Sequence, residues 1–368
     1  MKQEKLTLEN ILRQLPEPLL HWYRGNARDL PWRHTRDPYR IWVSEIMLQQ
    51  TRVAAVLGYY TRFLEAFPTV QALAQAPEDR LMKLWEGLGY YSRARNLQKA
   101  ARLVAEDYGG AFPPAYGQLL ALPGIGDYTA SAIASAAFAL PEPAVDGNVL
   151  RVVTRLTDCH DDILDAGTKK RIRQQLAEIM PREPEQVRIF NQATMELGAT
   201  VCVPNGPPKC GACPAAAFCR GRALGTAESL PVKRPKKPRT VEHWTVYLLL
   251  RPDGRAALRR RPDSGLLAGL WEFPNVPGEL TEEAAAAPLA QWGLRATAWE
   301  KKLTAKHIFT HREWQMTGYI LRIEGDGPED FQWVDGAGLA KCAVPSAFAR
   351  YYAEAQRLLR QEREGDAE

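Results

Sequence analysis

Two acidic residues stand where a carboxyl group could serve a reaction. Glu45 lies in the apolar stretch 42–48, where it is either a solvated edge residue or a buried acid with a raised pKa. Asp146 lies in 145–149, just before an expected helix, and capping that helix is its ordinary role. N–H donors at a cap also favour an ionised carboxylate, which can stabilise a cationic transition state. A buried acid near an ionised carboxylate would suit general acid catalysis.

A short glycine turn precedes the second of these carboxyl groups. Residues 122–126 lead into a helix of small residues that we predict over 129–138. Gly124 and Gly126 let backbone N–H groups approach a phosphate, and the helix N-terminus adds positive potential. The turn matches the hairpin of a helix-hairpin-helix motif, which holds a DNA backbone without reading sequence. An ordinary helix–helix turn is the alternative, because a single Gly-x-Gly is a weak signal.

Four of the six cysteines crowd into one Gly/Pro-rich stretch. Seven, two and five residues separate them, so their thiolates can converge without regular secondary structure. Such a set suits an iron–sulfur cluster or zinc, and the spacing leaves both metals and unligated cysteines open. The candidate ligands are Cys202, Cys210, Cys213 and Cys219. The other two, Cys159 and Cys342, stand alone, which is typical of inert buried thiols.

The elements that must position these residues change along the chain. Apolar residues recur at helical spacing over 8–223, whereas β-type runs begin at 241. The expected strands include 241–251, 255–261, 270–274 and 313–323, with helices near 282–292 and 346–360. The fold class is therefore an all-α domain with a cysteine loop, followed by an α+β domain. We place the helical domain at 1–224, an extended, exposed, basic linker at 225–240, the α+β domain at 241–361 and a frayed tail at 362–368.

Composition limits the class of protein. With 368 residues, 45% hydrophobic and 25% charged, the chain has ordinary globular usage and room for about two domains. The net charge of +5 is too small to establish a polyanionic partner. No apolar run approaches the ~18 residues of a membrane span, and the first residues do not form a secretion signal. We therefore expect a soluble intracellular protein without a membrane partner.

In this order and spacing, the stretches 122–126 and 145–148 and the cysteine loop resemble the helix-hairpin-helix DNA glycosylases of the endonuclease III superfamily. The stretches 44–51 (SEIMLQQT) and 85–91 (WEGLGYY), with the β-rich second half, are similar to its adenine DNA glycosylases. The resemblance implies a cytoplasmic, nucleoid-associated monomer that excises adenine mispaired with 8-oxoguanine, or with guanine, in double-stranded DNA. It also implies a Nudix-like second domain and a 4Fe-4S cluster held by the four cysteines.

The same resemblance implies roles for single residues. Glu45 would protonate adenine and Asp146 would stabilise the oxocarbenium ion, as fits the two-carboxylate logic of glycosyl transfer. Tyr128 and Asn148 would support them. Relatives that also cut the strand carry lysine where this chain has Tyr128, which implies an enzyme that removes only the base. The adenine pocket would include Arg33 and Gln192, near Arg28, Trp32, Leu48 and Glu196.

Contacts to the duplex are implied in the same way. Gln49 and Tyr90 would wedge into the base stack beside the lesion. Phe309, Thr310 and His311 would read 8-oxoguanine, with threonine in place of the family's serine. Two features depart from the family or from working Nudix hydrolases. The cysteine loop has one residue more than usual between its first two cysteines, and the stretch 269–294 lacks the acidic box that holds Mg²⁺, which implies no pyrophosphatase activity.

Two other functions compete with this one. A glycosylase for another base, such as thymine or an alkylated purine, would need the same helical domain, and a catalytically silent DNA-binding module would need only its surface. The silent module is disfavoured because Glu45 and Asp146 are both present. Another target base is disfavoured by the presence of the second domain.

Overall fold

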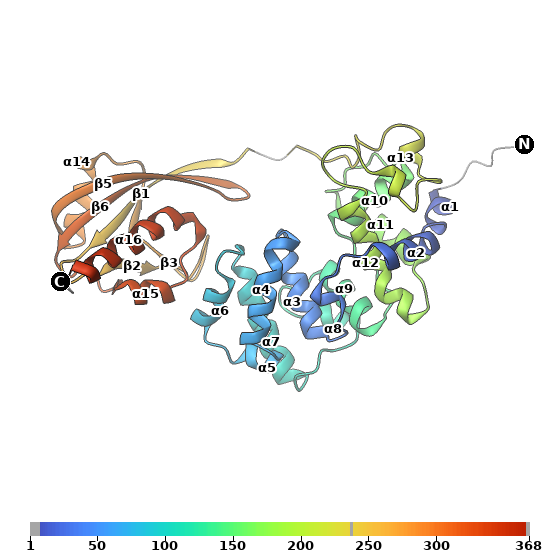
Figure 1. Ribbon diagram of the computed structural model, residues 1–368, viewed down its shortest axis with the longest axis horizontal. Helices are drawn as coiled ribbons and strands as arrows, with labels where there is room; N and C mark the ends of the chain where they lie inside the picture. The colour runs from blue at the N-terminus through green and yellow to red at the C-terminus, as the bar shows by residue number, and fades with distance from the viewer. Residues whose placement is uncertain (1–7, 236–237, 366–368) are drawn as a thin grey trace, which may run out of the picture. The chain divides into compact units, whose positions relative to one another are not determined.

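The computed structural model of the chain describes residues 8–235 and 238–365. Contacts between Cα atoms divide these residues into two units, one formed by 8–75 with 95–235 and the other by 76–94 with 238–365. Figure 1 shows helices in the first unit and a curled sheet with helices in the second. The expected fold class is confirmed. No helix in the described ranges is long and apolar enough to cross a membrane.

The first unit consists of helices joined by short turns. Its longer helices are α2 (Pro16–Asn26), α3 (Pro38–Leu48), α4 (Val53–Ala66), α7 (Ser92–Asp107), α9 (Asp127–Phe138), α10 (Gly147–Thr157), α11 (Ala166–Ile179) and α12 (Pro184–Thr200). Its shorter ones are α1 (Leu8–Arg13), α5 (Val70–Ala74), α8 (Tyr116–Leu120), α13 (Arg220–Ala223), η1 (Pro31–Arg33) and η2 (Cys210–Ala212).

The predicted glycine turn joins α8 to α9, which makes a helix-hairpin-helix. Gly124 has φ of 76°, and a Cβ there would lie 2.7 Å from the Asn96 Cβ, so only glycine fits without strain. Gly126 precedes the first residue of α9 and faces open space. Helix α9 is built of Ala, Ser and Thr residues that are almost all buried. Such small side chains let neighbouring helices pack closely around the turn.

The second unit is a seven-stranded mixed sheet with one helix layer on each face. Strand order is β3-β2-β1-β6-β5, with β4 paired to β1 and β7 to β2. The strands are β1 (Thr240–Leu250), β2 (Ala256–Arg260), β3 (Trp271–Glu272), β4 (Asn275–Pro277), β5 (Arg295–Ile308), β6 (Arg312–Glu324) and β7 (Phe331–Val334). The helices are α14 (Glu282–Gln291), α15 (Gly336–Lys341), η3 (Ser346–Phe348) and α16 (Ala349–Gly365). Alternate residues of β1 face α16 and α14, as strand geometry requires.

The predicted strands and helices of this unit are present, but four elements escaped prediction. Strand β5 is an exposed edge strand rich in Ala and Lys, a composition with few of the β-branched and aromatic residues that signal a strand. Strands β4 and β7 and helix α15 are too short for periodicity to detect. The expected frayed tail also differs, because α16 continues through Gly365. The last three residues lie outside the described part of the chain.

The segment 225–235 differs from the extended, exposed linker that its composition predicts. Leu230 is buried, its carbonyl oxygen accepts a hydrogen bond from Arg155 Nε at 2.9 Å, and Val232 O accepts one from Ile163 N at 3.1 Å. This stretch therefore belongs to the first unit. Lys233 and Arg234 are exposed, as expected, whereas Lys236 and Lys237 lie outside the described residues.

The segment 76–94 groups with the second unit, although the sequence places it inside the helical domain. It contains α6 (Glu78–Trp85) and the glycine-rich turn that ends at Tyr90. Lys83 Nζ donates to Cys342 O at 3.0 Å, and Val344 N donates to Glu86 Oε1 at 2.9 Å. These bonds between side chains and backbone cannot be foreseen from sequence periodicity.

Candidate active site

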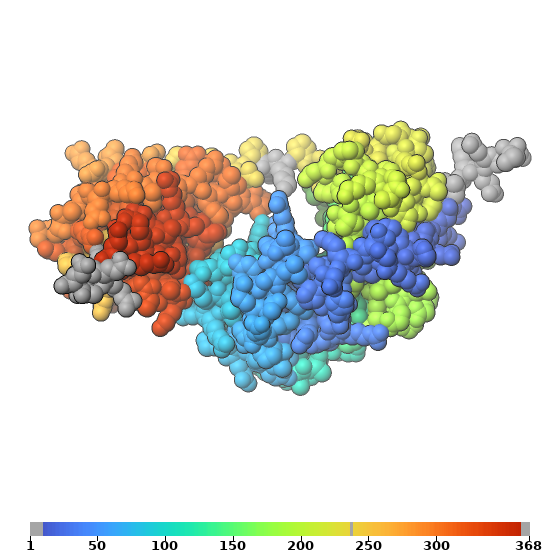
Figure 2. All heavy atoms as spheres, in the orientation of Figure 1, coloured from blue at the N-terminus to red at the C-terminus, as the bar shows by residue number. Residues whose placement is uncertain are grey.

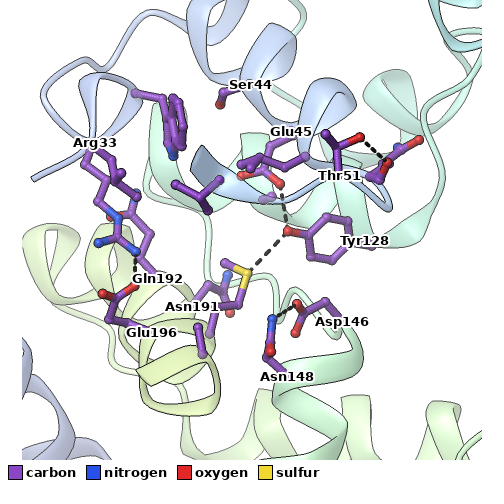
Figure 3. A pocket seen from close by; sticks show the side chains of 18 of the residues that line it. Arg33, Ser44, Glu45, Thr51, Tyr128, Asp146, Asn148, Asn191, Gln192 and Glu196 are labelled. Atoms are coloured by element: carbon purple, nitrogen blue, oxygen red, sulfur yellow. Dashed lines mark hydrogen bonds and ion pairs between the residues drawn. The ribbon is translucent and has the colours of Figure 1, made fainter. Parts of the chain in front are cut away.

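A cavity of about 950 Å³ opens in the first unit between α3, α9, α10 and α12. Figure 3 shows side chains from all four helices converging on it. Glu45, Tyr128 and Asp146 line it, together with Gln192 and Glu196 from α12. The structure thus brings together in one cavity the catalytic residues and the base-pocket residues that the sequence suggested from separate stretches.

Glu45 is half-buried as a residue, and its carboxyl is a desolvated acid rather than a solvated edge group. Burial raises its pKa to about 7, and the nearby Asp146 carboxylate adds to the rise. The Tyr128 hydroxyl donates to Glu45 Oε2 at 2.7 Å and opposes the rise by stabilising the charged form. A carboxyl group with this pKa carries a proton on a large fraction of molecules at neutral pH. It can therefore act as a general acid.

Tyr128 holds its place through two contacts. Besides the bond to Glu45, its oxygen lies 3.3 Å from Met195 Sδ, a contact that no sequence pattern indicated. Burial and the neighbouring carboxylates raise the pKa of Tyr128 well above its ordinary value. Its hydroxyl therefore stays protonated and neutral, which makes it a donor to Glu45 and a poor nucleophile.

Asp146 is both the cap of α10 and a member of the site. Its Oδ1 accepts from Val149 N at 2.8 Å, and its Oδ2 accepts from Asn148 Nδ2 at 2.7 Å. Burial raises the pKa of Asp146, while these hydrogen bonds lower it by stabilising the carboxylate. Capping fixes the position of a carboxylate that also lines the cavity. The two interpretations left open by the sequence are thus compatible.

Arg151 links this cap to the start of the cysteine loop. Its Nη2 donates to Asn148 Oδ1 at 2.8 Å and to Gly198 O at 2.7 Å, and its Nε donates to Cys202 O at 2.7 Å. The residue is only 5% exposed. A basic residue on an otherwise apolar helix was the only sequence signal for this role. The orientation of Asn148, and through it of Asp146, thus depends on the backbone at Cys202.

A polar wall closes the opposite side of the cavity (Figure 3). The wholly buried Glu196 accepts from Arg28 Nε at 2.7 Å and from Arg33 Nη2 at 2.6 Å. Although burial opposes ionisation, these hydrogen bonds lower the pKa of Glu196 to about 2. The carboxylate therefore stays charged and holds both guanidinium groups in place. Gln192 lies on the same wall, and Trp32 and Leu48 complete the lining.

The two predicted wedge residues lie in different units. Gln49 directly follows α3, lines the cavity and donates from Nε2 to Thr129 Oγ1 at 3.3 Å. The next residue, Gln50, is exposed with φ of 58°, and sequence reasoning missed it because backbone conformation leaves no trace in the pattern. Tyr90, in the second unit, is 45% exposed with φ of 47°. Gln50, next to the predicted wedge Gln49, and Tyr90 thus both adopt the left-handed backbone conformation that non-glycine residues rarely take.

The predicted reading residues occupy the turn between β5 and β6. Phe309 packs edge-on against Trp314, with 4.9 Å between ring centroids, while Thr310 and His311 are exposed. The Thr310 hydroxyl lies 2.8 Å from the Tyr90 hydroxyl. The turn therefore has an apolar brace beneath two exposed hydrogen-bonding side chains. One of these, Thr310, contacts Tyr90, which is predicted to wedge into the base stack.

The four cysteines line one apolar cavity in the first unit, with Val152, Leu156, Leu197 and Val201. None forms a disulfide. Pro204 to Pro207 are exposed, and Lys209 N donates to Val201 O at 2.9 Å, so the longer first loop closes on itself and bulges outward. The loop and α13 lie at the surface of the unit, in yellow-green and yellow in Figure 2. In the described residues no three His, Cys, Asp or Glu side chains form a site for a single metal ion.

The acidic residues of the stretch 269–294 do not form one site. Glu272 is buried and forms ion pairs with Arg259 and Arg261. Glu279 accepts from the Thr317 hydroxyl at 3.2 Å, and Glu282 begins α14. The buried carboxylate is therefore engaged by guanidinium groups, which leaves it unsuited to bind a divalent cation.

Comparison with known proteins agrees with this geometry. Residues 43–182 match the HhH-GPD superfamily of base excision DNA repair proteins, and residues 245–354 match the NUDIX domain. The chain is 35% identical over 396 residues to adenine DNA glycosylase of Rattus norvegicus, covering 91% of this chain and 76% of the relative. It is 33% identical over 311 residues to adenine DNA glycosylase of Buchnera aphidicola subsp. Baizongia pistaciae, covering 83% of this chain and 84% of the relative.

Solved structures resemble the first unit. A thermostable thymine-DNA glycosylase superposes with a TM-score of 0.54 and 29% identity, covering 59% of this chain and 100% of that one. An endonuclease III trapped as a covalent intermediate on DNA gives a TM-score of 0.50 with 26% identity, covering 59% of this chain and 98% of that one.

The fold and the paired carboxyl groups therefore define a base excision DNA glycosylase of the HhH-GPD superfamily. The chain belongs to the adenine DNA glycosylase family. It is an enzyme of base excision repair that binds duplex DNA and removes adenine.

The pH dependence of the reaction should report on Glu45. Because its pKa is about 7 and only the protonated form donates a proton, we predict that the single-turnover rate of adenine release falls as pH rises through about 7. Tyr128→Phe removes a hydrogen bond that holds this pKa down, so the falling limb should move to higher pH. Quenched single-turnover reactions across a pH series measure the rate of adenine release and so locate the pH at which it falls. A limb that stays in place in Tyr128→Phe, or persists in Glu45→Gln, would contradict this assignment.

Proposed function

We propose that the enzyme is a monofunctional glycosylase that extrudes adenine from a mispair with 8-oxoguanine and removes it. The observation that carries the proposal is the buried Glu45 carboxyl, bonded to Tyr128 and facing the same cavity as Asp146. A base must leave the duplex to enter such a cavity. The polar wall of Arg33, Gln192 and Glu196 offers hydrogen-bonding groups for its edge.

The chemistry follows from the two carboxyl groups. Glu45 gives its proton to adenine N7, and the bond between C1′ and N9 breaks with its electron pair going to the base. The sugar becomes an oxocarbenium ion, which the Asp146 carboxylate stabilises as an ion pair or covalent adduct. Water then adds to C1′ and loses a proton to the Glu45 carboxylate, leaving an abasic site. Asn148 keeps Asp146 oriented.

The same geometry supports removal of the base without strand cutting. Cleavage by a lyase step needs an amine that attacks C1′ to form a Schiff base. Position 128 instead holds a tyrosine whose neutral hydroxyl is bonded to Glu45. The expected product is therefore an abasic site in an intact strand.

Reading of the opposite base is assigned to the second unit. 8-Oxoguanine differs from guanine by an oxygen at C8 and a proton at N7, so a reader needs hydrogen-bonding groups at that edge. Thr310 and His311 supply them, and Phe309 braces the turn against Trp314. The bond between Thr310 and Tyr90 supports the idea that wedging and reading act at one place. The engaged Glu272 supports a Nudix fold that no longer hydrolyses pyrophosphates.

For the cofactor, we propose a 4Fe-4S cluster held by Cys202, Cys210, Cys213 and Cys219. Four thiols around one apolar cavity fit such a cluster, and Arg155 Nη1 lies 3.4 Å from Cys202 Sγ, where its positive charge would complement the negative charge of a bound cluster. When bound, the cluster would cross-link the loop that Arg151 contacts, and none of the chemical steps above uses it. We also propose that the enzyme acts as a monomer in the cytoplasm, where its DNA substrate lies.

A partner-base assay tests the proposed substrate. Adenine opposite 8-oxoguanine should be released faster than adenine opposite guanine, cytosine or thymine, with strand breaks only after alkali. Thr310→Ala with His311→Ala should narrow the preference for 8-oxoguanine over guanine by roughly tenfold or more, since each good contact contributes ~1–3 kcal/mol. Thr304→Ala, on strand β5 outside the turn, is the matched control. A double variant with the full preference, or nicking by the native enzyme before alkali, would overturn the corresponding assignment.

The cofactor has its own test. The protein purified under anaerobic conditions should be brown and contain about four irons per chain, as four thiolates around a cubane cluster require. Cys213→Ser should lower the iron content, whereas Cys159→Ser should leave it unchanged, because Cys159 does not line the cysteine cavity. A colourless protein with one zinc per chain would show the assignment to be wrong.

A further inference from the structure

Tyr23 on α2 supports the polar wall from behind. Its side chain is not part of the cavity lining and only 7% of the residue is exposed. The Tyr23 hydroxyl donates to Gln192 Oε1 at 2.9 Å. Its ring also faces the Arg33 guanidinium, with 5.5 Å from Cζ to the ring centroid. Both residues that the sequence placed in the base pocket therefore contact this one tyrosine.

The direction of the bond to Gln192 matters because the two ends of an amide differ. Oε1 can only accept a hydrogen bond, and Nε2 can only donate one. In the described part of the chain, Gln192 Oε1 is the one acceptor that the Tyr23 hydroxyl reaches. Turning the amide round would bring Nε2 to the hydroxyl and leave the buried tyrosyl proton without an acceptor, which is costly.

With Oε1 held in this way, the N–H groups of Gln192 remain for the ligand. No described residue accepts a hydrogen bond from Nε2, and Gln192 lines the cavity. Figure 3 shows Gln192 beside Arg33 and Glu196 on the same wall. A base in the cavity thus meets a donor at this point. The base that fits must present a hydrogen-bond acceptor there, such as an unprotonated ring nitrogen.

We propose that Tyr23 is a positioning residue for base specificity, which fixes Gln192 as a donor to N1 of adenine. N7 is taken by Glu45 in the proposed chemistry, and N1 is the ring acceptor on the Watson–Crick edge. Hypoxanthine presents the reverse pattern, with a proton on N1 and an oxygen at C6. A fixed donor therefore accepts adenine and rejects hypoxanthine. The inference rests on the proposed function only for the assignment of N7 to Glu45.

The test compares adenine with hypoxanthine opposite the same 8-oxoguanine. Tyr23→Phe keeps the ring against Arg33 but frees the amide to turn, so the ratio of the two single-turnover rates should fall by about tenfold or more. In a Gln192→Glu background, Tyr23→Phe should leave the ratio unchanged, because the two oxygens of a carboxylate are equivalent. Tyr39→Phe is the matched control, since it removes a buried tyrosyl bond, to Phe67 O at 2.7 Å, outside the cavity.

The outcomes separate specificity from simple structural support. A loss of thermal stability in Tyr23→Phe like that in Tyr39→Phe, with the ratio unchanged, would overturn the proposal. A measurement on the native protein adds a test that needs no variant. 1-Deazaadenine lacks N1, and its release should be about tenfold slower than that of adenine. Equal rates would also overturn the proposal, whereas a native protein that releases no adenine would overturn the function itself.

Discussion

The site depends on one constraint, which is that the Glu45 carboxyl must hold a proton near neutral pH while hydrogen bonds favour the charged form of the neighbouring Asp146 carboxyl. Desolvation on the apolar helix α3 raises the pKa of Glu45 to about 7. The Asp146 carboxyl is also desolvated, yet it sits at the N-terminus of α10 and accepts hydrogen bonds from Val149 and Asn148 that favour its charged form. Two chemically identical groups thus take opposite roles because their surroundings differ.

The rest of the helical unit keeps these surroundings in place. Asp146 and Glu196 around the cavity each have fixed donors, because an unpaired charge in such desolvated surroundings would be strongly destabilising. Arg28 and Arg33 serve Glu196 in this way, and Asn148 serves Asp146. Arg151 extends the arrangement to the cysteine loop. Rigidity at the cavity is therefore distributed over α2, α10, α12 and the loop rather than confined to the reacting groups.

Much of this could be predicted from sequence, for reasons that particular residues make clear. Gly124 must be glycine because its φ is positive and Asn96 crowds it, and Asp146 caps a helix, so both leave local signatures. The burial of Glu45 was undecidable from its helix alone, because burial depends on α9 and α12. Tyr23, Arg151 and Met195 act through contacts with residues distant in the chain, and no spacing rule reports these. The grouping of 76–94 with the second unit was missed for the same reason.

The central claim is that Glu45 and Asp146 carry out the chemistry and contribute little to binding of the duplex. The most direct test measures adenine release in a single turnover for Glu45→Gln and for Asp146→Asn, with binding to the lesion duplex measured in parallel. Glu185→Gln, an exposed acid on α12, is the control. We predict that each site variant loses at least about 10²-fold in rate, the usual size of such effects, while binding stays near that of the native protein. A native rate of release in either variant would contradict the account.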